Sequence, residues 1–218
     1  MINVANLLSK TSRIPGNYFA SNIYIKGDLE LGLLENRKGD RLLALPEVLI
    51  KAIYQGIETE TGDQARLVLF NCGKWWGKSF YVRFCEDLSE YYGKAISDME
   101  MIEFIQCLKQ CWKTHGWGVL EFDTSYYQQG FLLVTISHSP FAEMAGKSDR
   151  PVCYIEAGIL SSFFSQLTGR DLHCVQTACQ TLGAESNYFI LGLLDRLSMA
   201  ETMVEKKQDH DAIMLAIT

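Results

Sequence analysis

Apolar positions in the last third of the chain recur first with the spacing of a helix and then in strand-like runs. Six apolar side chains recur at three- and four-residue spacing, which places them on one helical face: Ile155, Ile159, Leu160, Phe163, Phe164 and Leu167. Gly169 follows them, where a glycine typically ends a helix. The runs 173–180 and 186–192 predict two strands joined across Leu182-Gly183-Ala184.

The rest of the chain predicts strands and helices in mixed order. Two hairpins are expected: 18–26 pairs with 29–35 across a turn at Gly27-Asp28, and 117–123 pairs with 130–138. A short apolar run at 42–45 predicts a further strand. One helix is expected to begin at Pro46, and a second to cover 63–92. A third is expected to begin at a cap on Asp98 and to end at Lys113, before His115-Gly116. The last is expected over 193–207, with a charged, mobile end.

Two of these helices have features that bear on packing. The helix after Pro46 carries an apolar stripe made of Val48, Leu49, Ala52, Ile53 and Ile57. In the region 63–92, Gly73 and Gly77 each cost roughly 1 kcal/mol relative to alanine in an exposed helix. These glycines predict either a break or the close approach of another backbone or of a ligand.

The composition is that of an ordinary globular protein. The 218 residues are 48% hydrophobic and 21% charged, and no apolar run approaches the roughly 20 residues that span a bilayer. The net charge of −6 argues against nucleic acid as a partner. The first residues lack the long apolar run of a secretion signal. Seven cysteines without disulfide-scaffold spacing favour a reducing, cytoplasmic setting.

Five residues of the last third stand where a known family pattern has them: Gly158, Gly169, Cys179, Gly183 and Phe189. In this the chain resembles the V4R (4-vinyl reductase-like) family. The resemblance implies an α/β (α+β) fold in which an antiparallel sheet packs with helices, similar to the fold of subunits of a vesicle-tethering complex. It also implies that the protein forms a homodimer. We expect a strand-rich N-terminal extension (1–45), a ligand-binding domain (46–192), and a C-terminal helix and tail (193–218).

Regulators of this family hold a structural zinc ion, and the resemblance maps its ligand positions onto Cys153, Gln176, Cys179 and Asn187. Two of these are amides, which are poor ligands because tetrahedral zinc sites use thiolate, imidazole or carboxylate. Cys153 and Cys179 remain as weak metal candidates. We expect two buried free cysteines rather than a zinc site.

All four tryptophans lie between positions 75 and 117. Because ligand pockets are mostly apolar and aromatic, these residues are candidates for lining a site for a planar molecule: Trp75, Trp76, Trp112 and Trp117. The alternative is that they fill the core, as large aromatic residues commonly do. Trp75 and Trp76 are the best candidates for a pocket wall, since both cannot face the same core. Phe163 is added to the predicted ligand contacts.

The resemblance also implies the class of ligand. Family members are associated with phenolic effectors or with chlorophyll-type pigments, and the sequence shows no attached DNA-binding or ATPase module. We therefore expect binding of a chlorophyll-type tetrapyrrole or a precursor. The protein would then be an accessory factor in pigment delivery or photosystem II assembly, with photosystem assembly proteins as partners and a location peripheral to the thylakoid membrane.

Two alternatives to this function stand beside it. The sequence has no GxGxxG after a strand, Walker A, HExxH or GxSxG motif, so we expect no catalytic activity. The first alternative is a protein-interaction scaffold without a ligand. The second, less favoured, is a vinyl reductase that would need an added electron donor.

A tetrapyrrole would also use an axial ligand or a polar anchor. His138 is the main candidate, because the alternation of its strand puts it on the apolar face with Leu132, Val134 and Ile136, where an imidazole needs a partner. A structural histidine with a satisfied hydrogen bond is the alternative. His115 is expected at a helix end, and His210 in the tail is set aside.

Overall fold

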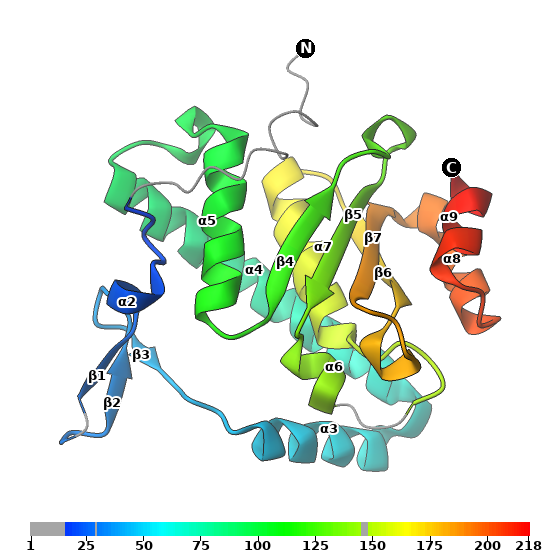
Figure 1. Ribbon diagram of the computed structural model, residues 1–218, viewed down its shortest axis with the longest axis horizontal. Helices are drawn as coiled ribbons and strands as arrows, with labels where there is room; N and C mark the ends of the chain where they lie inside the picture. Colours follow the sequence, from blue (N-terminus) through cyan, green and yellow to red (C-terminus); the bar gives the residue numbers. More distant parts are fainter. Residues whose placement is uncertain (1–15, 29, 145–147) are drawn as a thin grey trace.

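The centre of the molecule is a four-stranded antiparallel sheet. The structure, a computed structural model, describes residues 16–28, 30–144 and 148–218. In spatial order the strands are β4 (Val119–Asp123), β5 (Leu132–Ser137), β7 (Asn187–Leu193) and β6 (Leu172–Ala178) (Figure 1). All neighbouring strands are antiparallel. The expected fold class and the strand pairs expected at 117–138 and 173–192 are confirmed.

Helices α5 (Met101–Thr114) and α7 (Tyr154–Thr168) pack on one face of the sheet, and α4 (Ala65–Tyr92) packs against α7 in the same core. Alternate strand residues such as Leu120, Ile136 and Phe189 point into this main core. α7 ends at Gly169, as expected, with the glycine in the left-handed conformation (φ 66°). The Asp98 cap is wrong: Glu100 caps α5, and its capping box with Glu103 satisfies the free N–H groups at the start of the helix.

Two helices pack on the opposite face: α8 (Leu194–Glu205) and α9 (His210–Ile217). They form a second core with the other alternate strand residues, which include Leu133, Val175 and Ile190. The expectation of a mobile tail is therefore wrong. Asp209 caps α9, and His210 Nδ1 lies 2.7 Å from Thr177 Oγ1 on β6. A short helix behind a charged stretch has too few residues to show a clear apolar period.

α4 is one continuous helix, and its glycines mark a close crossing with α7. A Cβ atom on Gly73 would lie 2.2 Å from the carbonyl oxygen of Ile155, and one on Gly158 would lie 2.1 Å from that of Phe70. Only glycine leaves room for the two backbones to touch here. Of the alternatives raised by the sequence, the approach of another backbone is confirmed.

The N-terminal segment differs most from the sequence prediction. It contains a helical turn and a small antiparallel sheet: α2 (Ser21–Tyr24), β1 (Lys26–Asp28), β2 (Leu33–Glu35) and β3 (Arg41–Leu42). The strand expected over 18–26 is wrong, because Tyr18, Phe19 and Tyr24 are buried in the main core rather than alternating across a strand. Leu29, where the next strand was expected to begin, lies outside the described residues, as do residues 1–15.

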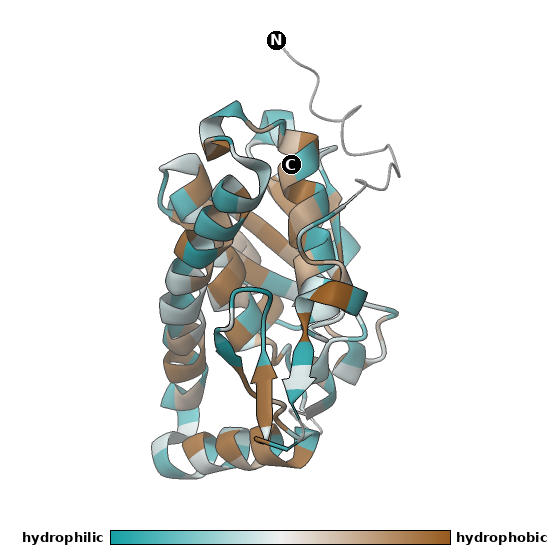
Figure 2. Ribbon diagram, turned by 90° about the vertical axis from the view of Figure 1, so that its left-hand side faces the viewer, coloured by the Kyte–Doolittle hydropathy of each residue, from teal (hydrophilic) through white to brown (hydrophobic). Residues whose placement is uncertain are grey.

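α3 (Glu47–Thr61) begins after Pro46 as expected, but its apolar positions are split between two faces. Tyr54, with Ile50 and Ile57, packs inward against Leu69 of α4 and Phe141 of α6 (Pro140–Met144). Figure 2 shows hydrophobic positions along this helix at the bottom of the molecule. Three apolar side chains of α3 and two of the segment before it are exposed, and we call these five residues the apolar edge: Leu43, Leu45, Val48, Leu49 and Ile53.

No helix within the described ranges is long and apolar enough to span a bilayer. The domain boundaries expected after residues 45 and 192 stay a prediction. The main core includes side chains from both sides of the first boundary, among them Phe19 and Phe84.

Candidate ligand-binding groove

A groove of about 700 Å³ lies between α4, the α5–β4 connection and the N-terminal segment. This volume is in the range of roughly 300–1,000 Å³ that is typical of small-molecule sites. We name it the aromatic groove after the rings in its lining, which include Tyr24, Trp76, Phe80, Phe84, His115 and Trp117.

One wall of the aromatic groove is a row of rings on α4. Trp76, Phe80 and Phe84 are four residues apart and therefore share one face of the helix. Trp117 meets this row edge to face, with its ring centroid 4.9 Å from that of Trp76 and 5.4 Å from that of Phe80. Such contacts hold aromatic side chains in defined orientations.

The backbone around Trp117 is fixed by two glycines and a hydrogen bond. Gly116 and Gly118 have φ of 73° and 99°, which side chains disfavour, and a Cβ on Gly118 would lie 2.5 Å from the carbonyl oxygen of Ser137. Trp112, buried behind, donates its indole Nε1–H to the carbonyl of Trp117 at 2.8 Å. The connection is thereby held in the one shape that presents Trp117 to the groove.

His115 follows the last residue of α5 and lies among the rings of the groove. Its centroid is 4.7 Å from that of Trp117 and 5.2 Å from that of Tyr24. Nδ1 is 2.8 Å from the carbonyl oxygen of Cys111, which can only accept, so Nδ1 carries the proton. Burial lowers the pKa of His115, although the bond to Cys111 opposes this effect. The imidazole is therefore neutral near pH 7, with its lone pair on Nε2.

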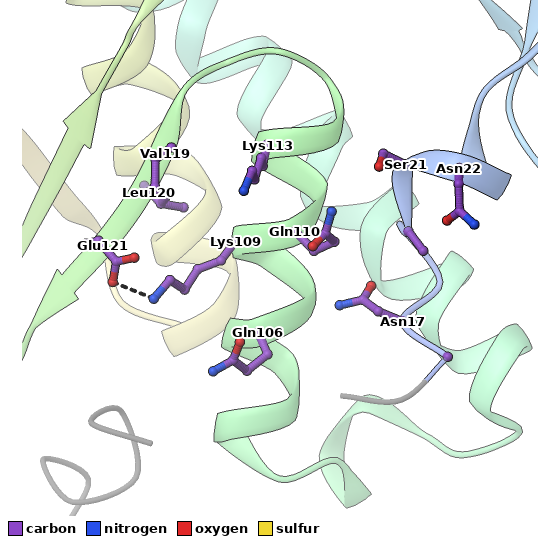
Figure 3. A pocket seen from close by; sticks show the side chains of 12 residues that line it. Asn17, Ser21, Asn22, Gln106, Lys109, Gln110, Lys113, Val119, Leu120 and Glu121 are labelled. Atoms are coloured by element: carbon purple, nitrogen blue, oxygen red, sulfur yellow. Dashed lines mark hydrogen bonds and ion pairs between the residues drawn. The ribbon is translucent and has the colours of Figure 1, made fainter. Parts of the chain in front are cut away.

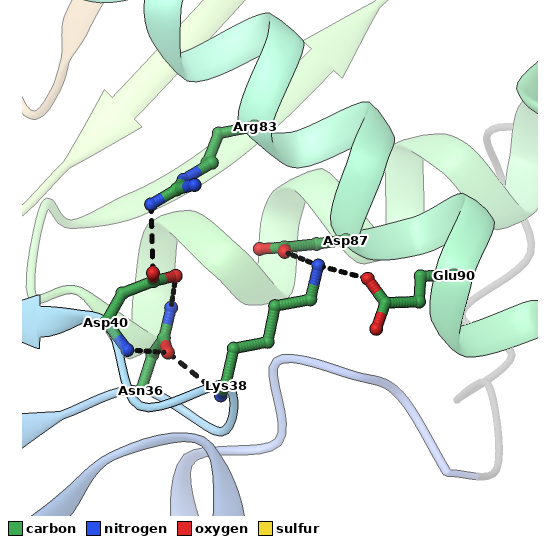
Figure 4. Close-up of polar contacts among 6 residues, drawn as sticks. All are labelled: Asn36, Lys38, Asp40, Arg83, Asp87 and Glu90. Atoms are coloured by element: carbon green, nitrogen blue, oxygen red, sulfur yellow. Dashed lines mark hydrogen bonds and ion pairs between the residues drawn. The ribbon is translucent and has the colours of Figure 1, made fainter.

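Ion pairs at the rim hold the β2–β3 turn against α4 (Figure 4). Lys38 Nζ lies 2.9 Å from Asp87 Oδ1 and 2.6 Å from Glu90 Oε2, and Arg83 Nη2 lies 3.1 Å from Asp40 Oδ1. Hydrogen bonds to both of its partners raise the pKa of Lys38. Burial raises the pKa of Asp87, and the hydrogen bond from Lys38 opposes this rise. These pairs close one side of the groove.

The structure brings together some of the side chains singled out from the sequence and separates others. Trp76 and Trp117 line the aromatic groove, and Trp112 supports it from behind. Phe163 is buried in the main core, where its ring lies 5.2 Å from that of Phe80, so it supports the wall without lining it. Trp75 is 81% exposed and does not line the groove.

The expected position of His138 is wrong. It follows the last residue of β5, has a positive φ of 55°, and is exposed rather than on the apolar face of the strand. Strand alternation fails here because the strand ends one residue earlier. The histidine of the groove is His115, for which the sequence signal was its place at a helix end beside Trp117.

At the family's zinc positions the structure has a network of amide hydrogen bonds. Gln176 Oε1 accepts from the backbone N–H of Cys153 at 2.8 Å, and Asn187 Oδ1 accepts from Gln180 N–H at 3.0 Å and from Gln176 Nε2 at 3.3 Å. The amide oxygens are therefore already engaged as acceptors. Within the described ranges, no three His, Cys, Asp or Glu side chains are placed to hold a metal ion. These residues do not fit a zinc site.

The two thiols of this network, Cys153 and Cys179, differ in acidity. A hydrogen bond with Cys153 and others from Thr181 lower the pKa of Cys179 to about 5, although burial opposes this. The same contact with Cys179 raises the pKa of Cys153, which stays protonated. Cys179 is therefore the more acidic thiol of the pair.

Glu156 is a fully buried carboxyl group on α7 that the sequence analysis did not single out. Ser139 Oγ donates to its Oε2 at 2.9 Å, and burial raises its pKa to about 8. A single glutamate inside the apolar run 155–167 was the available signal. It lies outside the lining of the aromatic groove.

A second groove of about 630 Å³ lies between α5, β4 and residues 16–22 (Figure 3). Its labelled side chains are mostly amides and charged groups, and Lys109 pairs with Glu121 across it. The described residues that line it include no aromatic ring. This polar groove suits a hydrophilic molecule, so the aromatic groove is the better candidate for a hydrophobic one.

Comparison with known proteins supports the resemblance seen in the sequence. Residues 132–193, from β5 to the end of β7, match the model of the V4R domain. No curated protein matches the chain. The structure is similar to the phenol-responsive sensory domain of the transcription activator PoxR, solved with phenol, with a TM-score of 0.64 and 16% identity over 90% of this chain and 99% of that one.

Two further structures are similar over smaller parts of this chain. A vinyl-4-reductase family protein from Methanocaldococcus jannaschii matches with a TM-score of 0.46 and 15% identity, over 69% of this chain and 82% of that one. The trafficking protein particle complex subunit 3 from Naegleria fowleri, covalently bound to palmitic acid, matches with a TM-score of 0.48 and 15% identity. The match covers 67% of this chain and 94% of that one.

Proposed function

Because residues 132–193 of this chain form a V4R domain, we propose that the protein binds a planar hydrophobic small molecule in the aromatic groove, without catalysing a reaction. The groove itself is the observation that carries the proposal. It combines ring walls from Trp76, Phe80 and Trp117 with a polar and charged rim that includes Asp40, Arg83 and Asp87. The PoxR sensory domain, which has the same fold, was solved with a small aromatic molecule.

We propose a chlorophyll-type tetrapyrrole or its precursor as the ligand. A single phenol ring would occupy a small part of the groove volume of about 700 Å³, whereas a macrocycle would fill much more of it. A role in pigment delivery or photosystem II assembly, with assembly proteins as partners and a location at the thylakoid surface, is part of this proposal.

The proposal is tested by titrating the protein with metal-free protoporphyrin IX and following the Soret band. Trp76→Ala should weaken binding about tenfold, which corresponds to ~1.4 kcal/mol and is reasonable for one lost ring contact. Trp75→Ala is the matched control, because it removes the same side chain from the adjacent, exposed position. Equal effects of the two variants, or an unshifted Soret band with the wild type, would contradict the proposal.

The apolar edge favours a second candidate, a protein-interaction scaffold. Its five side chains lie at one end of the molecule, where contact with a partner would remove them from water. The two functions are separable by experiment. A scaffold alone would bind no porphyrin yet would lose its partners when the edge is made charged.

A further inference from the structure

His115 is distinguished from the other three histidines by its surroundings. His173 Nε2 is 2.8 Å from Glu201, His210 bonds to Thr177, and His138 is exposed beyond the end of β5. His115 alone lines the aromatic groove. A ligand held there would therefore meet this imidazole.

The hydrogen bond of His115 has the arrangement that prepares a histidine to bind a metal ion. Metal-ligating imidazoles nearly always donate their second ring N–H to a carbonyl or carboxylate, which fixes the tautomer and the ring orientation. Here Nδ1–H donates to the carbonyl of Cys111 at 2.8 Å, which leaves the lone pair on Nε2. The contacts with Trp117 and Tyr24 further restrict the ring.

Nε2 of His115 is free to meet a ligand. No described residue forms a hydrogen bond with this nitrogen. Nor is it one of the buried side-chain atoms of the described ranges that lack a hydrogen-bond partner. Nε2 is therefore accessible, and the side chain of His115 lines the groove. Charged side chains of α4 also line the groove, and the buried carboxylate among them, Asp87, is paired with Lys38.

We propose that His115 Nε2 binds the central metal ion of a metal-containing tetrapyrrole as its axial ligand. The inference rests on the proposed function and narrows it to tetrapyrroles that hold a metal ion with an open axial position, such as magnesium or zinc. A coordination bond forms from the Nε2 lone pair, and no proton or electron is transferred. Neutral imidazole is the form required, and burial keeps His115 in that form by lowering its pKa.

The test compares zinc protoporphyrin IX with metal-free protoporphyrin IX, which differ only in the metal. The wild type should bind the zinc form more tightly, with a Soret shift of five-coordinate zinc. His115→Gln and His115→Phe should each lower affinity for the zinc form about tenfold or more and leave the metal-free form within about twofold. The phenylalanine keeps a ring against Trp117, so a folded variant is available even if glutamine perturbs packing. His138→Gln is the matched control and should change neither affinity.

The outcomes separate this inference from the proposed function. If both porphyrins lose the same affinity in the His115 variants, the side chain only packs, and the inference is overturned while the groove remains a binding site. An unchanged affinity for the zinc form would also overturn it. If neither porphyrin binds to the wild type, the proposed function itself fails.

Discussion

Glu156 keeps a proton that an exposed carboxyl group would lose at neutral pH. Burial in the core raises its pKa to about 8, whereas the pKa in the unfolded chain is about 4.3. A raised folded-state pKa means that the protonated group contributes stability fully below about pH 4. This contribution falls as the pH rises from there through about 8.

Glu156→Gln should therefore stabilise the protein at alkaline pH. Glutamine keeps an oxygen that accepts from Ser139 but cannot ionise. At pH 8.5 the variant should be more stable by on the order of 5 kcal/mol, and near pH 4.5 the two proteins should differ little. Urea unfolding at both pH values measures this. Parallel stability profiles for the two proteins would show that the carboxyl is ionised in the fold.

The amide network at Gln176 and Asn187 predicts that stability does not depend on zinc. Chelation with EDTA should leave the melting temperature of the wild type unchanged. The double variant Gln176→Glu/Asn187→Cys supplies the carboxylate and thiolate that zinc prefers, beside Cys153 and Cys179. It should bind one zinc ion and lose several degrees of melting temperature on chelation. A chelator-sensitive wild type would refute this prediction.

Residues of the candidate site could be predicted from the sequence only where the residue type itself indicated a ligand contact. Residue type alone singled out all four tryptophans, and the preferred pair Trp75 and Trp76 is divided in the structure, because Trp76 lines the groove and Trp75 is exposed. His138 was misplaced because a strand that ends one residue early puts the next side chain outside, and a two-residue period cannot show the end. The role proposed for His115 rests on a hydrogen bond to Cys111 and on neighbouring rings from other elements, which no local pattern contains.

At the scale of helices, the crossing of α4 and α7 depends on missing side chains. Gly158→Ala should lower the free energy of unfolding by at least roughly 2 kcal/mol, because its Cβ would overlap the carbonyl of Phe70. Gly56→Ala in α3 is the matched control, since no atom lies within 4 Å of its added Cβ. It should stabilise the protein by about 0.5–1 kcal/mol. A loss of similar size in both variants would mean that the crossing tolerates a methyl group.

Most elements were predictable from the sequence because their apolar periods are long. α7 is buried along residues 156–164, and the strands of the main sheet bury alternate residues in the main core and in the second core. The strand prediction for 18–26 was wrong because Tyr18, Phe19 and Tyr24 are residue types common in strands. In the structure all three are buried in the main core. α3 shows a different limit, since periodicity identifies apolar positions without showing which of them are covered.

For the whole molecule, the apolar edge predicts self-association. Val48 is 77% exposed at the start of α3, and burial against a second copy would remove it and its neighbours from water. Sedimentation analysis should give twice the chain mass of 24.7 kDa. Val48→Glu should shift the mass toward the monomer, whereas Gln55→Glu, which adds the same charge to the same helix, should not. A monomeric wild type would disprove this arrangement.

The four indole N–H signals in a ¹⁵N–¹H correlation spectrum, recorded with and without zinc protoporphyrin IX, test the aromatic groove most directly. The chain has one tryptophan outside the groove, one behind it and two in its lining. The ring current of the porphyrin should shift the signals of Trp76 and Trp117 strongly and leave that of Trp75 in place. A spectrum in which Trp75 alone moves, or in which no indole signal moves, would contradict binding in the aromatic groove.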